Sequence, residues 1–255
     1  MYLWQYWRDT RRSVYFYLSS LLLFVLISVT GIIHANRIHH VYGSAENLWQ
    51  AAVAMAFTVT FLCALIMTFV LGNNNVGSEI QKGTGDYLLT RPRPRRYFVW
   101  AGWAAGMAEV LALMTVSAVV ALGCMALAVG PALWRQARWT TQFNAQGSIS
   151  SVPLIAVNLV LMAATIFGLT FFLTVLFKNA SRGVVTSLAI VFGYSALSEV
   201  LKQWAGISLP GFHFAQQVGA LAPWYLAPRV EIPLWTILAL AFPFAAQAAL
   251  NRSDV

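Results

Sequence analysis

Apolar residues run along this chain in six long blocks that are separated by short polar connections. A helix needs roughly 20 apolar residues to cross about 30 Å of hydrocarbon, and each block approaches or exceeds that length. The blocks lie near residues 14–33, 51–71, 98–129, 152–177, 184–201 and 232–250. The pattern therefore predicts an all-α integral membrane protein with six transmembrane helices, forming a single domain over residues 1–255.

The composition excludes a water-soluble domain of this size. Of the 255 residues, 59% are hydrophobic and only 9% are charged, where a soluble domain carries roughly 25% charged residues. The mean hydropathy of +0.68 agrees with this. Because the six blocks take up more than half of the chain, the connections leave no room for an enzyme domain outside the membrane, and we expect no catalytic residues.

The net charge of +8 reports membrane orientation here rather than a nucleic-acid partner. Cytoplasmic connections of membrane proteins carry an excess of Lys and Arg. With both termini inside, eleven of the sixteen cations fall in inside segments, although Arg135 and Arg138 fall outside. We therefore expect a multi-pass protein of the cytoplasmic (inner) membrane, with both termini cytoplasmic and no bound nucleic acid.

Residues 1–13 predict a short helix that lies in the headgroup plane ahead of the first block. On a helical wheel, aromatic residues including Trp4 and Trp7 fill one arc, and Arg8 and Arg12 occupy the opposite one. Such a helix places its rings at the boundary and its guanidinium groups against anionic lipid or a partner protein. The alternative is a frayed basic N-terminus. A cleavable signal is excluded because the apolar run that follows is too long.

The longest inside connection, residues 72–96, is also the most charged stretch of the chain. Three asparagines at 73–75 can cap a helix start, and apolar residues then recur at roughly helical spacing at Val76, Ile80, Tyr87 and Leu88. The helix should stop near Leu89, because Pro92 and Pro94 disfavour helical geometry at the residues before them. We predict a short amphipathic helix across the inner mouth, followed by a stiff basic strap.

This loop resembles the connection between the second and third spans in the membrane permeases of type-2 ATP-binding-cassette (ABC) exporters. The resemblance rests on a glutamate, a Gly-Thr step, a Leu-Leu pair and a Pro-x-x-Arg element, here Glu79, Lys82, Gly83, Thr84, Leu88, Leu89 and Pro92 to Arg95. The short tail Arg252-Ser253-Asp254 agrees with it. In that family the segment is the coupling helix that docks on the ATPase subunit, so the resemblance implies this role for these residues.

The resemblance also implies an assembly. Two copies of an ABC ATPase subunit would bind ATP and Mg²⁺, a second permease would complete the translocation path as a homodimer or a paired half, and membrane lipid would surround it. This chain would carry no cofactor, since Gly72 to Ser78 has only part of the phosphate-loop spacing and lacks its lysine. The alternative for Glu79 is an ordinary surface contact with Lys82 at i, i+3.

Two carboxylates, Glu109 and Glu199, fall within apolar blocks, where an ionisable residue is costly and is a functional candidate. Glu199 lies near the outer end of the fifth block, and we expect Lys202 to neutralise it in a structural role. Glu109 either faces the translocation path near mid-membrane or pairs with an arginine, if the third span starts later and leaves it near the inner surface.

The outside stretch 205–230 is too apolar for a solvated loop and too broken by Gly and Pro for a span. Such backbone is tolerated at membrane depth only when it is buried in protein or lines a cavity. We predict short re-entrant helices that gate the outer exit, with Pro210, Gly211, Pro223 and Trp224 as gate residues. The resemblance implies the same element.

Other candidate sites are weaker. Gly193 to Ala196 resembles the nucleophile segment of intramembrane serine proteases, but Ser195 has no obvious histidine base. We expect no metal site, since neither spacing nor acidic neighbours support one at the four histidines. Gly102 and Gly106 permit close helix approach, either as ordinary bundle packing or as a dimer face.

These features predict the permease subunit of an ATP-driven exporter, a transport subunit rather than an enzyme. The first alternative is an ion-coupled secondary transporter with Glu109 as its carrier, although the halves show no matched pair of interrupted spans. The second is a non-transporting membrane scaffold that uses the basic loop to hold a partner.

Overall fold

The structure is a computed structural model that describes residues 59–72, 76–81, 95–129, 142–143, 149–150, 152–206 and 228–252. The first apolar block at 14–33 and the predicted interfacial helix at 1–13 lie outside these residues.

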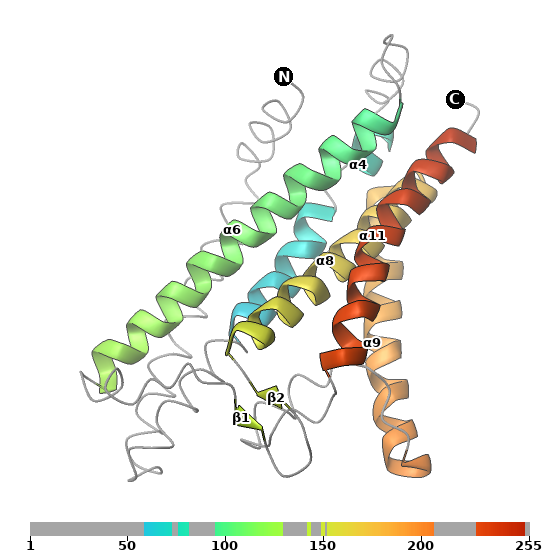
Figure 1. The fold of residues 1–255 in the computed structure, drawn as a ribbon. Coiled ribbons are helices and arrows are strands. Elements are labelled where there is room, and N and C mark those ends of the chain that lie inside the picture. The colour runs from blue at the N-terminus through green and yellow to red at the C-terminus, as the bar shows by residue number, and fades with distance from the viewer. Residues whose placement is uncertain are drawn as a thin grey trace.

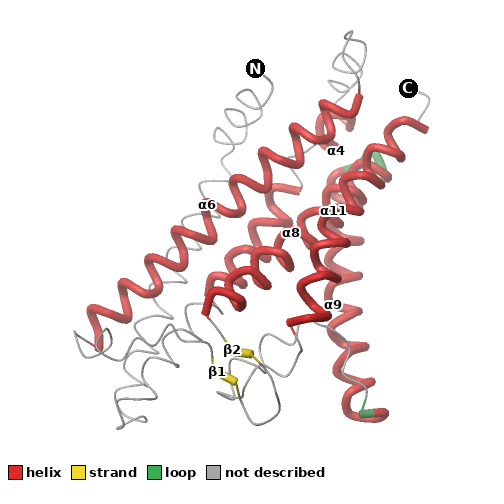
Figure 2. The backbone as a smooth tube through the Cα atoms, in the orientation of Figure 1, coloured by secondary structure: helices red, strands yellow, loops and turns green. Residues whose placement is uncertain are grey.

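Nearly all of the described residues are helical. Helix 59–72 is followed by α4 (Val76–Gln81), α6 (Arg95–Val129), α8 (Val152–Leu176), α9 (Ala180–Ala205) and α11 (Pro228–Arg252). Between α6 and α8, the two-residue strands β1 (Gln142–Phe143) and β2 (Ile149–Ser150) pair antiparallel, with Phe143 opposite Ile149 (Figure 2). The all-α prediction is confirmed for this part of the chain, apart from the small strand pair.

Five described segments are long and apolar enough to cross a membrane. They run over Val59–Gln81, Arg96–Ala121, Ala156–Leu176, Ala180–Ala205 and Ile232–Arg252. They correspond to the second to sixth predicted blocks, so the protein is a multi-pass membrane protein. The first predicted span falls outside the described residues.

Several span boundaries differ from the sequence prediction, including the end of the second span and the start of the fifth. The second span, predicted to end at residue 71, extends to Gln81, and the fifth, predicted to start at 184, starts at Ala180. The fifth starts early because Asn179 caps it: its side-chain Oδ1 accepts the Arg182 N–H at 3.0 Å. Lys178, with φ 50°, makes the tight turn from α8 into α9.

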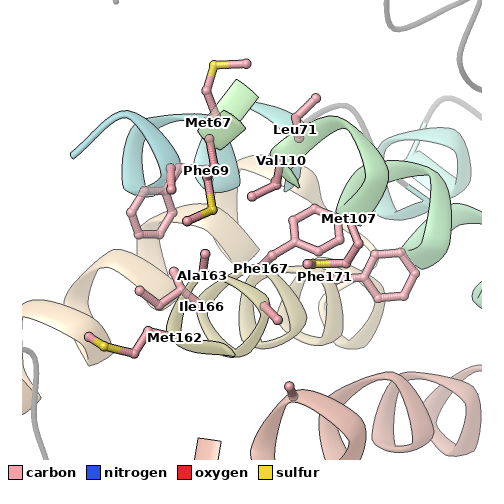
Figure 3. Close-up of a cluster of buried hydrophobic side chains, with 14 of the residues drawn as sticks. Met67, Phe69, Leu71, Met107, Val110, Met162, Ala163, Ile166, Phe167 and Phe171 are labelled. Atoms are coloured by element: carbon pink, nitrogen blue, oxygen red, sulfur yellow. The ribbon is translucent and has the colours of Figure 1, made fainter. Parts of the chain in front are cut away.

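Helix α8 is the centre of the bundle. About 72% of its span is buried, close to the 73% of Val59–Gln81 and well above the 33% of α6, 22% of α11 and 17% of α9. Phe167 and Phe171 of α8 are fully buried and meet Met107 and Val110 of α6, with Met67 of helix 59–72 beside them (Figure 3). Since lipid tails are as apolar as these side chains, close packing rather than burial from water stabilises this core.

The helices gather at one end and diverge at the other (Figure 1). Helix α4, the first turns of α6 and α9, and the last turns of α8 and α11 share one end, which we call the α4 end; β1 and β2 lie at the opposite end. Near the α4 end, Trp100 Nε1 of α6 donates to Gln247 Oε1 of α11 at 2.9 Å.

Candidate functional site: the junction of α4, α8 and α9

The candidate coupling segment is packed into the bundle through small residues at three successive levels. At the first level, Thr170 of α8 lies between Gly72 and Ser187. A Cβ added at Gly72 would overlap the Thr170 Cγ2 methyl group. The Thr170 and Ser187 hydroxyls lie 2.7 Å apart, and Thr170 Oγ1 donates to the Ile166 carbonyl. Because a hydroxyl has one proton, Ser187 is then the donor to Thr170.

At the second level, Thr174 of α8 is held between two glycines. A Cβ added at Gly77 of α4 would lie 2.5 Å from the Thr174 carbonyl oxygen, and one at Gly183 of α9 would lie 2.5 Å from Thr174 N and Cα. These are contacts with backbone, which cannot move aside as a flexible side chain can. Any side chain at Gly77 or Gly183 would therefore force the helices apart.

At the third level, a hydrogen bond joins the ends of α4 and α9. Gln81 Oε1 accepts the backbone N–H of Ala180 at 3.1 Å, across 99 residues of sequence. Gln81 is the last residue described in α4, and Ala180 is the first of α9. We call the three levels together the α4 junction, formed by Gly72, Gly77, Gln81, Thr170, Thr174, Ala180, Gly183 and Ser187.

The α4 junction explains sequence features that had suggested other chemistry. Gly72 and Gly77, which partly match a phosphate loop, allow close approach to α8. Sequence reasoning did not identify Gln81, Thr174 or Gly183. A usable signal was present, because Thr170/Thr174 and Gly183/Ser187 each place small residues four apart on one helix face.

The α4 end is basic. Four cationic side chains are described, namely Arg96, Lys178, Arg182 and Arg252, and all four are exposed at this end. The Arg96 guanidinium lies 5.3 Å from the centre of the Tyr97 ring. The carboxylate of Glu79 on α4 is at the same end, in a half-buried residue. This end therefore offers a positive surface around one acidic residue.

Only part of the predicted coupling set is described. Glu79 lies on α4, and Arg95 is the first residue of α6. The predicted surface helix differs from α4 in two respects. The prediction put it between the second and third spans, whereas α4 lies within the stretch Val59–Gln81 that is long and apolar enough to be the second span. Three consecutive residues, Val76, Gly77 and Ser78, are also buried, where an amphipathic surface helix buries one face. The physical reason is Gly77, whose missing side chain lets the α4 backbone reach α8.

Several predicted site residues lie outside the described part of the chain. They are Lys82, Gly83, Thr84, Leu88 and Leu89 of the coupling set, Trp4, Trp7, Arg8 and Arg12 of the interfacial helix, and Pro210, Gly211, Pro223 and Trp224 of the outer gate. Their roles stay predictions.

The two intramembrane carboxylates have different surroundings. Glu109 is 8% exposed on α6 and lies midway along the apolar stretch Arg96–Ala121, and its two predicted roles stay predictions. Glu199 is half-buried near the end of α9, where its Oε1 accepts from Gln203 Nε2 at 3.3 Å. Gln203 is thus one partner of Glu199; the Lys202 side chain lies outside the described part of the structure, so its predicted pairing with Glu199 stays a prediction.

The remaining candidate residues, Ser195 and Gly106, have structural roles. Ser195 Oγ donates to the Val191 carbonyl at 2.9 Å, within its own helix. A Cβ at Gly106 would overlap the Phe167 ring of α8, so this glycine serves packing inside the bundle. Among the described residues, no group of three or more His, Cys, Asp and Glu is placed to hold a metal ion.

Comparisons with known proteins give a family but no characterised relative. Comparison with curated proteins found no match. Comparison with solved structures found none either. One family, described as a protein of unknown function (DUF2705), matches residues 20–255, which is most of the chain. The chain therefore belongs to the DUF2705 family.

Proposed function

We propose that this protein is the permease subunit of an ATP-driven exporter of the type-2 ABC class. It works beside a second permease, and two separate ATPase subunits bind ATP and Mg²⁺. The observation that carries the proposal is the α4 junction, because it ties the segment that resembles a coupling helix to two membrane-spanning helices at the basic end of the bundle.

The junction has the property that coupling needs. An ATPase outside the membrane acts on its permease by moving an element that is packed rigidly enough to carry the spans with it. Gly77 contacts the α8 backbone directly, and the Gln81 side chain bonds to the α9 backbone. A push on α4 would therefore reach α8 through a backbone contact and α9 through the Gln81 hydrogen bond.

The charge at the α4 end supports a cytoplasmic position for the proposed docking face. Lys and Arg concentrate on the cytoplasmic side of membrane proteins, and the four described cationic side chains all lie at this end. We propose the cytoplasmic membrane as the location, with the last residues of the chain inside. Glu79 then offers a carboxylate to a cationic group on the ATPase.

The test is isolation of the tagged full-length chain from its native membrane in mild detergent, followed by mass spectrometry and an assay of ATP hydrolysis. We expect a phosphate-loop ATPase to co-purify in equal amount with the permease. Absence of such an ATPase from a preparation in which the chain itself is folded would overturn the proposal.

A matched pair of variants, each of which replaces a glutamate by the uncharged glutamine, tests whether Glu79 contacts the ATPase. Glu79→Gln should weaken ATPase capture roughly 10-fold, since a charge-assisted hydrogen bond is worth about 1.5–3 kcal/mol before exposure to solvent reduces it. Glu199→Gln makes the same change at the opposite end and should leave capture unchanged. Equal capture by Glu79→Gln and the unmodified chain would move the docking contact away from α4.

One observation favours a second candidate, an ion-coupled transporter. Glu109 is a buried carboxylate in the middle of a span, and such residues often carry protons or ions. The purified chain can be placed in liposomes with a trapped pH-sensitive dye and an imposed membrane potential. Proton flux that is lost in Glu109→Gln would favour this candidate, whereas an ATP-driven permease should show no Glu109-dependent flux.

A further inference from the structure

We infer that Gln81 is a positioning residue that latches α4 to the first turn of α9, so that a displacement of α4 is passed to α9. This rests on the proposed function for its use in coupling, but the latch itself is a property of the bundle. It identifies Gln81 as the side chain through which a movement of α4 would be passed to the span α9.

The first reason is where the bond falls. The first N–H groups of a helix have no partner within the helix and take one from a cap. In α9, the Asn179 side chain satisfies Arg182, and the Gly183 N–H bonds to the Asn179 carbonyl at 3.0 Å. The Ala180 N–H is satisfied by Gln81, from a helix distant in sequence. The first turn of α9 is therefore completed by α4.

The second reason is that α9 has few other attachments. Its main packing partners among the described elements are α8 and α4, and it is the least buried of the described spans. Val185, Phe192 and Trp204 are exposed by 64%, 59% and 88%. A helix attached along one side and bonded at one end can tilt as a unit when that end is displaced.

The third reason is that the second level of the α4 junction, at Thr174, restricts sliding of α4 and α9 along α8. Gly77 meets the carbonyl group of Thr174 and Gly183 meets its N and Cα, so α4 and α9 share one contact residue on α8. A shift of α4 that kept Gln81 bonded would carry the first turn of α9 along. A shift that broke the bond would leave the Ala180 N–H without its cap. Gln81 thus couples the position of α4 to the position and hydrogen bonding of the first turn of α9.

The latch is tested by backbone hydrogen exchange in the full-length chain in lipid nanodiscs, without any ATPase. Gln81→Ala should speed exchange in residues 180–183 roughly 2- to 10-fold, as loss of one net hydrogen bond predicts. Gln81→Glu keeps an acceptor oxygen, and its charge suits a helix N-terminus, so it should keep the slow exchange. Gln203→Ala removes a glutamine from the other end of α9 and should leave residues 180–183 unchanged.

The role in coupling is tested in the complex with the co-purified ATPase. Trapping with ADP and vanadate should change exchange in the first turn of α9 in the unmodified chain and in Gln81→Glu, and this response should be lost in Gln81→Ala although the ATPase stays bound. Unchanged exchange in nucleotide-free Gln81→Ala, or a full vanadate response in that variant, would overturn the latch. Failure to capture any ATPase would instead overturn the proposed function, because the nanodisc result does not depend on it.

Discussion

The two ends of α9 are held in opposite ways. In its first two turns, Ala180, Gly183 and Ser187 are buried, the Gly183 backbone lies close to that of Thr174, and Ala180 donates a hydrogen bond to α4. In its last turns Trp204 is 88% exposed, and α9 diverges from α6, whose Leu127 is 89% exposed (Figure 1). The difference indicates a helix that is held firmly at its first turns, its fixed end, and less closely at its last turn, although Ser198 in its second half is fully buried. The fixed end coincides with the candidate coupling segment.

A fixed end makes α9 a lever. Its 26 residues span about 39 Å at 1.5 Å per residue. A tilt of about 10° about the first turn would therefore move the far end by roughly 7 Å, while the α4 junction stays closed. Small displacements at the docking segment would become large ones at the opposite membrane face.

The largest expected difference in the free energy of unfolding is between alanine substitutions at two glycines of α9. Gly183→Ala places a Cβ against the Thr174 backbone and should lower the free energy of unfolding by about 1–3 kcal/mol, through overpacking. Gly193→Ala meets nothing within 4 Å and should raise it by roughly 0.5 kcal/mol, through helix propensity. Denaturation in detergent micelles measures both. Equal destabilisation by the two variants would remove the contrast between the closely packed first turns and the middle of α9.

A smaller effect is expected from hydroxyl removal at the junction. Thr170→Val keeps the shape of the side chain but removes its bond with Ser187, so it should cost about 0.6–1.7 kcal/mol, the range for hydrogen bonds between membrane helices. Thr115→Val on α6 removes an exposed hydroxyl that bonds only within its own helix, to Leu111, and should cost less. The same denaturation measurement ranks the two, and a larger loss in Thr115→Val would contradict the junction's role.

The smallest change in the free energy of unfolding is expected in the last turns of α9. Gln203→Ala removes the exposed contact with Glu199, a pair four residues apart, and should change the free energy of unfolding by less than about 0.5 kcal/mol. A loss comparable to that in Thr170→Val would mean that the far end of α9 is held as firmly as the first turn.

Hydropathy located most spans well, and the reasons for its errors in the second and fifth spans are instructive. The predicted block 152–177 became α8 at Val152–Leu176, because the apolar run is bounded by polar residues on both sides. The second and fifth spans extend further than predicted because their ends are polar or small: Gly77, Ser78 and Glu79 in one, Ser181 and Arg182 in the other. A hydropathy scale counts such residues as loop, yet glycine and serine promote close helix packing.

The candidate site was only partly predictable for a different reason. Glu79 was identified because its motif is local in sequence. The contacts that hold α4 join Gln81 to Ala180 and Gly77 to Thr174, roughly a hundred residues apart. Local periodicity reports which face of a helix is apolar or small, but not which distant helix that face meets. The latch between α4 and α9 therefore required the three-dimensional structure.

The measurement that tests the central claim most directly is a pair of spin-label distances between α6 and α9 in the complex with its ATPase. One pair, Tyr97→Cys with Arg182→Cys, reports the α4 end, and the other, Leu127→Cys with Trp204→Cys, reports the far end; all four residues are exposed. The background carries Cys63→Ala and Cys124→Ala. On trapping with ADP and vanadate, we expect the far distance to shift by several ångströms and the α4-end distance to shift much less. An equal shift at both ends, or no shift at the far end, would contradict a lever that pivots at the α4 junction.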